Sequence, residues 1–305
     1  MSRRVEFSRF GGPEVLDLVE VVPPEAGLGE VRVRVAATSL NPLDYKIFGN
    51  LPTSSPHVFD LPSGNGADFA GTVDQVGEGV EDFAVGDEVL GSQLRSAQSD
   101  FVVIDPAKLI RKPDNLDWVR AAGLTTVART AAASVKAIRV GPGDTVLVSA
   151  AAGGVGILAC QLAKRAGARV IGTASPENHD FLVSLGVEPV EYGDGLVDAV
   201  RAIAPDGITA ALDNHGRPSV DAALALGAPA SRINSIADYA ASGDYGTLAV
   251  GGTAATQEDL ADVAALVANG DIQLPIDSTY PLEEVRAAYE RLLARHVRGK
   301  IVLTL

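Results

Sequence analysis

The residues with the clearest chemical potential form a glycine-rich stretch, A-A-A-G-G-V-G at 150–156. Its pattern Ala151-x-Gly153-x-x-Gly156 has the spacing of a dinucleotide-binding turn, with alanine at the first glycine position. Residues this small let the backbone approach a pyrophosphate, and the free N–H groups at the start of a following helix attract its negative charge. The residues predicted to contact the pyrophosphate are Ala152, Gly153, Gly154, Val155 and Gly156.

A turn of this kind needs a strand before it and a helix after it, and the flanking residues predict both. Residues 145–150 are almost continuously apolar and β-branched, as in a strand buried on both faces of a parallel sheet. Apolar residues then recur at helical spacing from Val155 to Ala166, and a second strand is predicted at 169–173. This context favours a dinucleotide site over the alternative, a tight strand-to-helix turn without a ligand.

The alternation of strands and helices continues along the second half of the chain. After a helix at 117–137, strands are predicted at 145–150, 169–173, 188–191, 208–212, 231–236 and 247–250, and helices at 154–166, 176–185, 195–203, 218–226 and 256–269. This order predicts an α/β fold with a doubly wound parallel sheet. The tail is predicted to form a helix at 283–295 and a strand at 299–305.

The first part of the chain is instead rich in short strands. Residues 31–37 alternate charged and apolar side chains, which predicts a strand with one solvated face. Further strands are predicted at 69–76, 88–90 and 101–104, separated by glycine and Asp-Pro turn signals. Short strands at this spacing predict a barrel or a sandwich.

Length and composition limit the class of protein. With 305 residues the chain has room for two domains, and its net charge of −14 disfavours nucleic acid and anionic membranes as partners. The single cysteine, Cys160, excludes an intrachain disulfide, and no metal site is predicted. The N-terminus lacks the apolar core of a signal peptide. The uncharged run 145–163 has 19 residues, about the length of a membrane span, but its adjacent glycines argue against that interpretation. We therefore expect a soluble, cytoplasmic protein.

Several further motifs, taken together, resemble a known family. They are N-P-L-D-Y-K at 41–46, G-A-D-F-A-G-T-V-D-Q-V-G at 66–77, V-G-D-E-V at 85–89, A-A-A-G-G-V-G at 150–156, S-L-G at 184–186 and R-G-K-I-V-L at 298–303. With its β-rich head and short return tail, the chain resembles the medium-chain dehydrogenase/reductase superfamily. It is similar in particular to the zinc-free branch of quinone oxidoreductases, zeta-crystallin-like proteins and enone reductases.

The resemblance implies a GroES-like catalytic domain made of residues 1–117 and 272–305, with a Rossmann dinucleotide-binding domain at 118–271 between them. It also implies a homodimer joined through the edge strand 245–251. Zinc-dependent relatives carry an early cysteine and a Gly-His-Glu, where this chain has Asn41-Pro-Leu-Asp44 and Gly66-Ala67-Asp68. Without a Lewis acid to polarise an alcohol, a quinone or an α,β-unsaturated carbonyl is the expected small-molecule substrate.

Residues 41–46 carry the candidates for catalysis. Lys46 is one of six lysines and is expected in the loop after the alternating strand. The resemblance places it near nicotinamide, where an ammonium can stabilise enolate charge on a substrate oxygen, whereas the alternative is an exposed solvating lysine. Tyr45 is a second candidate for proton donation or stacking, unless it is a half-buried core residue. Asn41 and Asp44 are turn formers that shape the loop, and Asn41 is also a candidate cofactor contact.

The stretch after the second strand of the parallel sheet bears on the choice of cofactor. An NAD enzyme carries an acid about 20 residues past the first glycine, where this chain reads Gly172-Thr-Ala-Ser175. The resemblance places Ser175 and Tyr192 near the 2′-phosphate of NADPH, and Ser175 also suits a helix N-cap. Many members of the family carry Lys or Arg near this position, whereas this chain has Glu177. We expect NADPH, in preference to NADH, as the cofactor.

Other positions at the strand ends complete the predicted cofactor site. Thr130 matches a family threonine beside the nicotinamide ribose, and Asn214 follows a strand at the carboxyl edge of the sheet, where ligands bind. Ser235 and Ile236, at the end of the next strand, should flank the nicotinamide. His215 departs from the family pattern and is either a substrate or acid–base residue or a histidine in a surface turn.

In the tail, Arg298 and Lys300 are assigned to the cofactor phosphates. The alternative is that both are simply charged residues at the end of a strand. His179 or Arg129 is a further source of positive charge near the 2′-phosphate. The resulting hypothesis is a zinc-free, NADPH-dependent oxidoreductase that transfers hydride to quinones or enones. A non-catalytic NADPH-binding redox sensor or crystallin-like protein is the alternative. The loops expected to bind substrate, 49–63, 91–99 and 236–246, show no pattern that identifies it.

Overall fold

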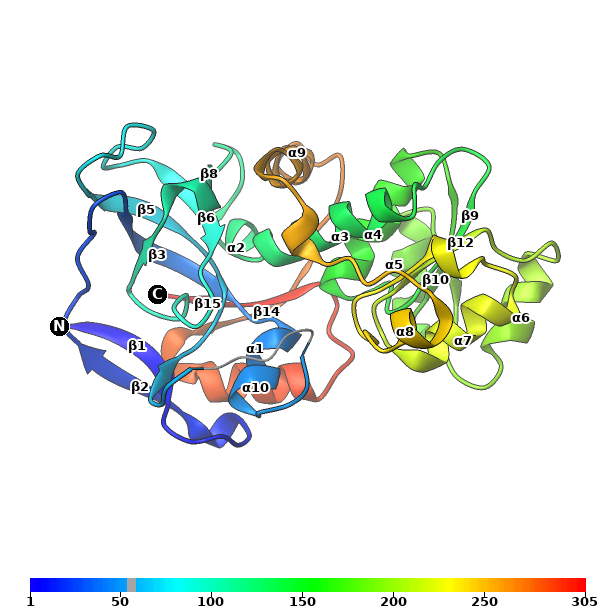
Figure 1. Ribbon diagram of the computed structural model, residues 1–305, viewed down its shortest axis with the longest axis horizontal. Coiled ribbons are helices and arrows are strands. Elements are labelled where there is room, and N and C mark those ends of the chain that lie inside the picture. Colours follow the sequence, from blue (N-terminus) through cyan, green and yellow to red (C-terminus); the bar gives the residue numbers. More distant parts are fainter. Residues whose placement is uncertain (54–58) are drawn as a thin grey trace. The chain divides into compact units, whose positions relative to one another are not determined.

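The computed structural model describes residues 1–53 and 59–305 (Figure 1). The described chain forms two compact units. The first comprises Met1–Thr126, Leu260–Asp271 and Pro275–Leu305, and the second comprises Val127–Asp259 and Ile272–Leu274. Both ends of the chain therefore belong to the first unit. Loop 49–63, which we expected to bind substrate, lies partly outside the described residues.

The larger sheet of the first unit is built around β3 (Val31–Ser39), whose alternating pattern buries one face. It pairs antiparallel with β5 (Asp68–Val76), β7 (Phe101–Ile104) and β15 (Lys300–Thr304). The strand order is β14-β15-β3-β5-β6-β8. The remaining strands are β6 (Glu88–Ser92), β8 (Leu109–Arg111) and β14 (Ile276–Pro281). The last strand of the chain thus pairs directly with one from its beginning.

A second sheet in the same unit has the order β2-β1-β4, formed by β1 (Ser2–Phe7), β2 (Leu16–Val21) and β4 (Ser63–Gly64). The sequence pattern did not predict it, because the residues of β1 read S-R-R-V-E-F without a clean apolar alternation. Its Val5 and Phe7 are nonetheless completely buried. Tertiary packing, rather than local pattern, specifies this sheet.

Helix α1 (Pro42–Phe48) follows β3 directly, where the sequence predicted a loop. The carboxylate of Asp44 accepts a hydrogen bond from the backbone N–H of Asn41 at 2.8 Å, and Pro42 occupies the first helical position. Ile47 and Phe48 fill the core beneath it, next to α10 (Val285–Leu293). The expected turn formers therefore start a helix, which gives residues 45 and 46 fixed positions on a rigid element.

The second unit contains a five-stranded parallel sheet of order β11-β10-β9-β12-β13 (Figure 1). The strands are β9 (Thr145–Val148), β10 (Arg169–Thr173), β11 (Glu188–Val190), β12 (Ala210–Asp213) and β13 (Ile233–Ser235). The chain runs outward from β9 to β11 and then returns to β12 on the other side of β9. This reversal creates a crevice at the carboxyl ends of the central strands, as the predicted doubly wound sheet requires.

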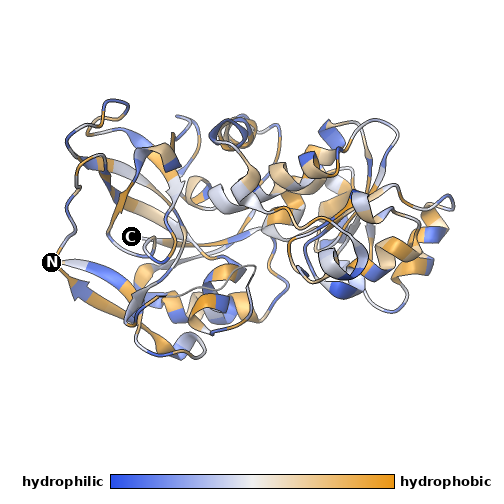
Figure 2. Cartoon of the chain, viewed as in Figure 1, coloured by the Kyte–Doolittle hydropathy of each residue, from blue (hydrophilic) through white to orange (hydrophobic). Residues whose placement is uncertain are grey.

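Four helices of the second unit, together with α9 (Gln257–Ala268), follow the predicted alternation with bounds shifted by a few residues, whereas α8 (Ala241–Tyr245) lies in 236–246, where a loop was predicted. Figure 2 shows apolar residues both on the strands of the sheet and on the helices beside it, where they alternate with hydrophilic ones. The four helices are α4 (Gly154–Arg165), α5 (His179–Ser184), α6 (Leu196–Ile203) and α7 (Arg217–Ala225), and α9 is shared between the units. No helix in the described part of the chain is both long enough and apolar enough to cross a membrane.

Two predicted elements need correction. The helix expected at 117–137 is divided at Gly123 into α2 (Trp118–Ala122) and α3 (Thr125–Ala137), consistent with the low helix propensity of glycine. The strand expected at 247–250 is reduced to a single parallel bridge between Asn234 and Leu248. There, the side chain of Asn234 bonds both the N–H and the carbonyl of Val250, at 2.7 and 3.0 Å, in place of a continued ladder.

Candidate functional site

The glycine turn lies between β9 and α4, as predicted. Gly153 is the N-cap of α4, has ordinary extended backbone angles and provides no side chain to bond the first-turn N–H groups. Ala150 adopts a left-handed backbone conformation with φ 48°, which costs energy for a residue with a Cβ. The turn is therefore strained at its start and leaves the amino end of a twelve-residue helix without a side-chain cap.

Gly153 and Gly156 have different roles in this turn. A Cβ at Gly156 would lie 2.2 Å from the carbonyl oxygen of Ala150 and 2.8 Å from the Cα of Ala151, so only glycine allows α4 to pack against the turn. A Cβ at Gly153 would lie 3.3 Å from the same carbonyl oxygen, and the residue is partly exposed. Gly156 is thus required for packing, and Gly153 is the position where a ligand can approach the backbone.

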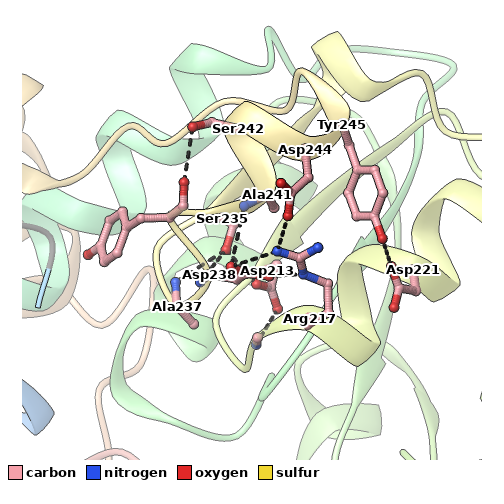
Figure 3. A network of polar contacts seen from close by, with 12 residues as sticks. Asp213, Arg217, Asp221, Ser235, Ala237, Asp238, Ala241, Ser242, Asp244 and Tyr245 are labelled. Carbon is pink, nitrogen blue, oxygen red and sulfur yellow. Dashed lines mark hydrogen bonds and ion pairs between the residues drawn. The ribbon is translucent and has the colours of Figure 1, made fainter. Parts of the chain in front are cut away.

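Asp213 organises the carboxyl edge of the parallel sheet (Figure 3). The carboxylate is 2% exposed and accepts hydrogen bonds from the hydroxyls of Ser149 and Ser235, at 2.9 and 2.6 Å. It also accepts from the backbone N–H groups of His215 and Gly216, at 3.0 and 2.9 Å. One carboxylate therefore connects the ends of β9, β12 and β13.

Asp213 and Ser149 were not predicted from the sequence, although their neighbours Asn214 and Ala150 lie in predicted segments. Asn214 donates from its side chain to the carbonyl of Ser149 at 2.9 Å and is half-buried. The Ser235 hydroxyl is completely buried and committed to Asp213, while Ile236 is partly exposed just beyond it. The signal that could have found this group is the occurrence of polar residues at the ends of two adjacent strands.

The segment after β13 is held by an arginine on α7 (Figure 3). Arg217 forms an ion pair with Asp238 and bonds Asp244 at 2.7 Å, while its guanidinium lies 5.0 Å from the ring centre of Tyr245. The hydrogen bond from Arg217 lowers the pKa of Asp238 below its ordinary value. Tyr245 in turn donates to Asp221 at 2.9 Å, so α7 fixes a segment that we expected to bind substrate.

The residues expected at the 2′-phosphate lie at the carboxyl ends of β10 and β11. Ser175 is 7% exposed, and its hydroxyl accepts from the side chain of Asn178 at 3.3 Å rather than capping the following turn. Glu177 is exposed. Tyr192 is 47% exposed, and its ring stacks with that of His215, with centroids 6.3 Å apart.

Arg129 and Thr130 lie on α3. Arg129 donates to the carbonyls of Gly252 and Ala255, at 3.2 and 2.9 Å, and to the side chain of Gln257 at 2.8 Å. This guanidinium holds a loop of its own unit, so the suggestion that it provides charge for a phosphate needs correction. Thr130 is 8% exposed, and a Cβ on Gly252 would lie 2.9 Å from its hydroxyl oxygen.

In the first unit, Tyr45 and Lys46 lie side by side in sequence on α1, and both are half-buried. The Tyr45 ring packs against the core of that unit. Five of the six lysines have a hydrogen-bond or ion-pair partner: Lys108, Lys112, Lys136, Lys164 and Lys300. Among the described residues, no such partner exists for the ammonium of Lys46.

Lys300 has a different environment from the one expected. It is 3% exposed, and its ammonium donates to the carbonyl of Leu40 at 2.8 Å and to the side-chain oxygen of Asn41 at 2.6 Å. The Asn41 amide donates onward to Asp68 at 3.0 Å, and Asp68 also accepts from the hydroxyl of Thr126 at 2.6 Å. The assignment of Lys300 to a cofactor phosphate is corrected, because its charge is used inside the unit.

This buried polar cluster also contains Asp44. Burial raises the pKa of Asp44 to about 7, while the backbone hydrogen bond from Asn41 opposes the shift and the charge of Asp68 adds to it. Burial lowers the pKa of Lys300, against the attraction of both carboxylates. The cluster fixes the start of α1 and therefore the position of residues 45 and 46.

Arg298, in the tail, is partly exposed. The backbone N–H of Arg298 donates to Asp277 at 3.1 Å. Burial raises the pKa of the Cys160 thiol to about 12, so it stays protonated and unreactive near neutral pH. Within residues 1–53 and 59–305, no three His, Cys, Asp or Glu side chains are grouped so as to hold a metal ion.

Comparison with known proteins places this geometry in a family. Residues 27–114 match the model of the alcohol dehydrogenase GroES-like domain, and residues 185–303 match that of the zinc-binding dehydrogenases. A quinone oxidoreductase from Pseudomonas aeruginosa is 34% identical over 330 residues. The aligned region covers 99% of this chain and 99% of that protein.

Solved structures agree over the full chain. The quinone oxidoreductase of Coxiella burnetii has a TM-score of 0.86 at 30% identity, covering 100% of this chain and 99% of that one. Escherichia coli quinone oxidoreductase complexed with NADPH has a TM-score of 0.88 at 27% identity, covering 99% of this chain and 100% of that one. With its GroES-like and Rossmann-type folds, this chain belongs to the quinone oxidoreductase branch of the medium-chain dehydrogenase/reductase superfamily.

Proposed function

We propose that this protein is a zinc-independent, NADPH-dependent reductase of quinones or α,β-unsaturated carbonyls. The observation that carries the proposal is that the second unit has an uncapped glycine turn after β9, while the first unit has on α1 an ammonium, that of Lys46, with no partner among the described residues. Relatives named quinone oxidoreductases, one of them described in complex with NADPH, support the same activity. Bound NADPH would supply the hydride.

The residues of the second unit fit a dinucleotide. Gly153, Gly154 and Val155 are partly exposed at the amino end of α4, where backbone N–H groups can bond the pyrophosphate. Ala152, Gly156 and Asp213 shape this site from inside, since all three are buried. Ser175 and Tyr192 are proposed for the adenosine end. For the nicotinamide end we propose Thr130, Asn214, Ser235 and Ile236.

In the first unit, Lys46 is proposed to bond the substrate oxygen. Reduction of a quinone or an enone places negative charge on that oxygen, and a positioned ammonium stabilises it. Tyr45, next to it on α1, is proposed to contact the flat substrate or to deliver the proton that completes the reaction. Asn41 is proposed to act through the position of α1, together with Lys300, and Arg298 stays a candidate contact for a phosphate.

Zinc independence is supported by the residues at the positions that ligate zinc in other members. Asp44 caps α1, and Asp68 accepts hydrogen bonds from Asn41 and Thr126, so both carboxylates are committed within the unit. Ala67 has no ligand atom. A homodimer joined along 245–251 and a cytoplasmic location also stay predictions. Any such interface would use a segment that forms one bridge rather than the expected strand.

The test measures NADPH oxidation with 1,4-benzoquinone and with cyclohex-2-enone. Lys46→Met should lower kcat by about 100-fold, the cost of removing one donor to a developing oxyanion, and should leave the dissociation constant for NADPH unchanged. Lys108→Met, which removes a lysine bonded to Gln93, is the matched control and should keep full activity. Treatment with a chelator should change neither rate.

Each other outcome has a defined meaning. Full activity of Lys46→Met would remove Lys46 from the mechanism. Tight NADPH binding without turnover of either acceptor would favour the non-catalytic alternative. Loss of activity on chelation, restored by zinc, would overturn zinc independence.

A further inference from the structure

Tyr192 and His215 meet although their strands are not neighbours. Tyr192 comes two residues after β11, and His215 comes two residues after β12. In the sheet order β11-β10-β9-β12, two strands lie between them. Their ring centroids are nevertheless only 6.3 Å apart, with the ring planes inclined by 29°.

The contact between Tyr192 and His215 spans the distance between β11 and β12, across β10 and β9. Three strand spacings of about 4.8 Å separate β11 from β12 by about 14 Å. Both residues lie beyond the carboxyl ends of their strands, so the pair extends along the carboxyl ends of β10 and β9. The loops after β9 and β10 lead to α4 and α5, whereas those after β11 and β12 lead to α6 and α7, which right-handed connections place on the opposite face.

The pair therefore borders the crevice on the side opposite the glycine turn. If NADPH binds as proposed, its pyrophosphate lies at Gly153, beyond the end of β9. Its adenosine ribose lies beyond the end of β10, near Ser175, where an NAD enzyme carries its acid. The adenine then has to lie along the ends of β9 and β10, against the two rings.

The exposure and bonding of the two side chains suit this role. Tyr192 is 47% exposed, and His215 is also exposed. In the described part of the chain, neither the Tyr192 hydroxyl nor the His215 ring has a hydrogen bond, and the backbone of His215 is fixed by Asp213 at 3.0 Å. The rings are thus held in place from the backbone while their faces and polar atoms stay available to a ligand.

We propose that Tyr192 and His215 form an aromatic wall that packs against the adenine of the cofactor, so that His215 contributes to affinity for the adenosine half. This inference rests on the proposed function, because it assumes the same cofactor in the same crevice. Flat aromatic rings pack favourably at centroid separations of 4.5–7 Å. His215 would accordingly act in binding rather than as an acid or base on the substrate.

The test uses the two halves of the cofactor as separate probes. Dissociation constants are measured by calorimetry for NADPH, AMP and reduced nicotinamide mononucleotide, which lacks adenosine. His215→Ala and Tyr192→Ala should each weaken NADPH and AMP about fivefold, as expected for the loss of one aromatic contact, and leave the mononucleotide unchanged. His215→Phe should restore binding to within about twofold of the unmodified protein, since it keeps the ring.

A control variant removes exposed apolar surface elsewhere in the same unit. Ile203→Ala lies at the end of α6 and should leave all three constants unchanged. Unchanged AMP binding in His215→Ala would overturn the wall while leaving the proposed function intact, provided that NADPH still binds. Failure of His215→Phe to restore AMP binding would assign His215 a polar contact and overturn the stacking role. Absence of NADPH binding in the unmodified protein would overturn both proposals.

Discussion

At the scale of single residues, the end of β10 determines which charges a cofactor phosphate meets. Ser175 is buried and places no negative charge there, whereas Glu177, two residues later, is exposed. A carboxylate a few ångströms from a phosphate in water repels it by about 1 kcal/mol, and salt weakens the effect further. Glu177 should therefore reduce, but not abolish, a preference for NADPH.

Replacing Glu177 by Gln tests this expectation. The affinity for NADPH relative to NADH should rise up to about fivefold, because only NADPH carries the 2′-phosphate that the carboxylate repels. The measurement is fluorescence titration with both cofactors at low and at high salt, and the gain should shrink at high salt. Asp180→Asn, an exposed acid on the neighbouring helix α5, removes the same charge and serves as the control. An equal change in both variants would show that only net charge matters.

At the scale of elements, the glycine turn and α4 work as one unit. Gly156 cannot be tested cleanly, because a Cβ there would overlap the backbone of Ala150 and disturb packing as well as binding. Gly153 has backbone angles that any residue can adopt, and it is the N-cap of α4. Asp and Asn are both favourable N-caps, so either should support the helix while changing what a ligand meets.

The variants Gly153→Asp and Gly153→Asn separate charge from shape. Both should unfold at temperatures equal to or above that of the unmodified protein, because each adds a side-chain cap. Gly153→Asp should weaken NADPH at least tenfold more than Gly153→Asn, since its carboxylate occupies the place of the pyrophosphate charge. Calorimetric titration and thermal denaturation measure the two effects. Equal NADPH affinity of the two variants would mean that the pyrophosphate binds elsewhere.

At the scale of the whole molecule, the buried cluster of the first unit couples stability to pH. The groups facing Asp44 are Asp68 on β5, Lys300 on β15, Tyr289 on α10 and the backbone of Asn41. The pKa of Asp44 is about 7 in the folded protein and has an ordinary value of 3.8. Between these values the folded state binds more protons than the unfolded state, so stability falls as pH rises. The pKa of Lys300 is lowered from its ordinary value of 10.5. Between the lowered value and 10.5 the unfolded state binds more protons, so this shift makes stability rise with pH.

Asp44→Asn should remove the contribution of Asp44. The free energy of unfolding of the unmodified protein should fall relative to that of the variant as pH rises from about 4 to about 7, by at most about 1.4 kcal/mol per pH unit. Asparagine can still accept the hydrogen bond from Asn41, so α1 should keep its start. Urea denaturation across this range measures the difference, with the exposed Asp114→Asn as control. Parallel curves for Asp44→Asn and the unmodified protein would contradict the shifted pKa.

Local pattern was sufficient for features that depend on neighbours in the chain. The spacing of Gly153 and Gly156 predicted the turn, and the apolar run before it predicted β9, because both reflect backbone geometry within a few residues. The alternation of strands and helices predicted the doubly wound sheet for the same reason. Pattern failed at α1, where a capping box that begins a helix was interpreted as a loop.

Contacts between distant residues were decided only by the tertiary structure. The sequence marks Lys300 as a charge at a strand end, but the pairing of β15 with β3 turns its ammonium toward Leu40 and Asn41. Asp213 becomes the centre of three strand ends, and Tyr192 meets His215 across two strands, because of the order in which the parallel strands lie. Residue types and spacing thus determined which chemistry this protein carries. Strand order and burial decided which side chains stay available to perform it, since these depend on pairings that no local pattern encodes.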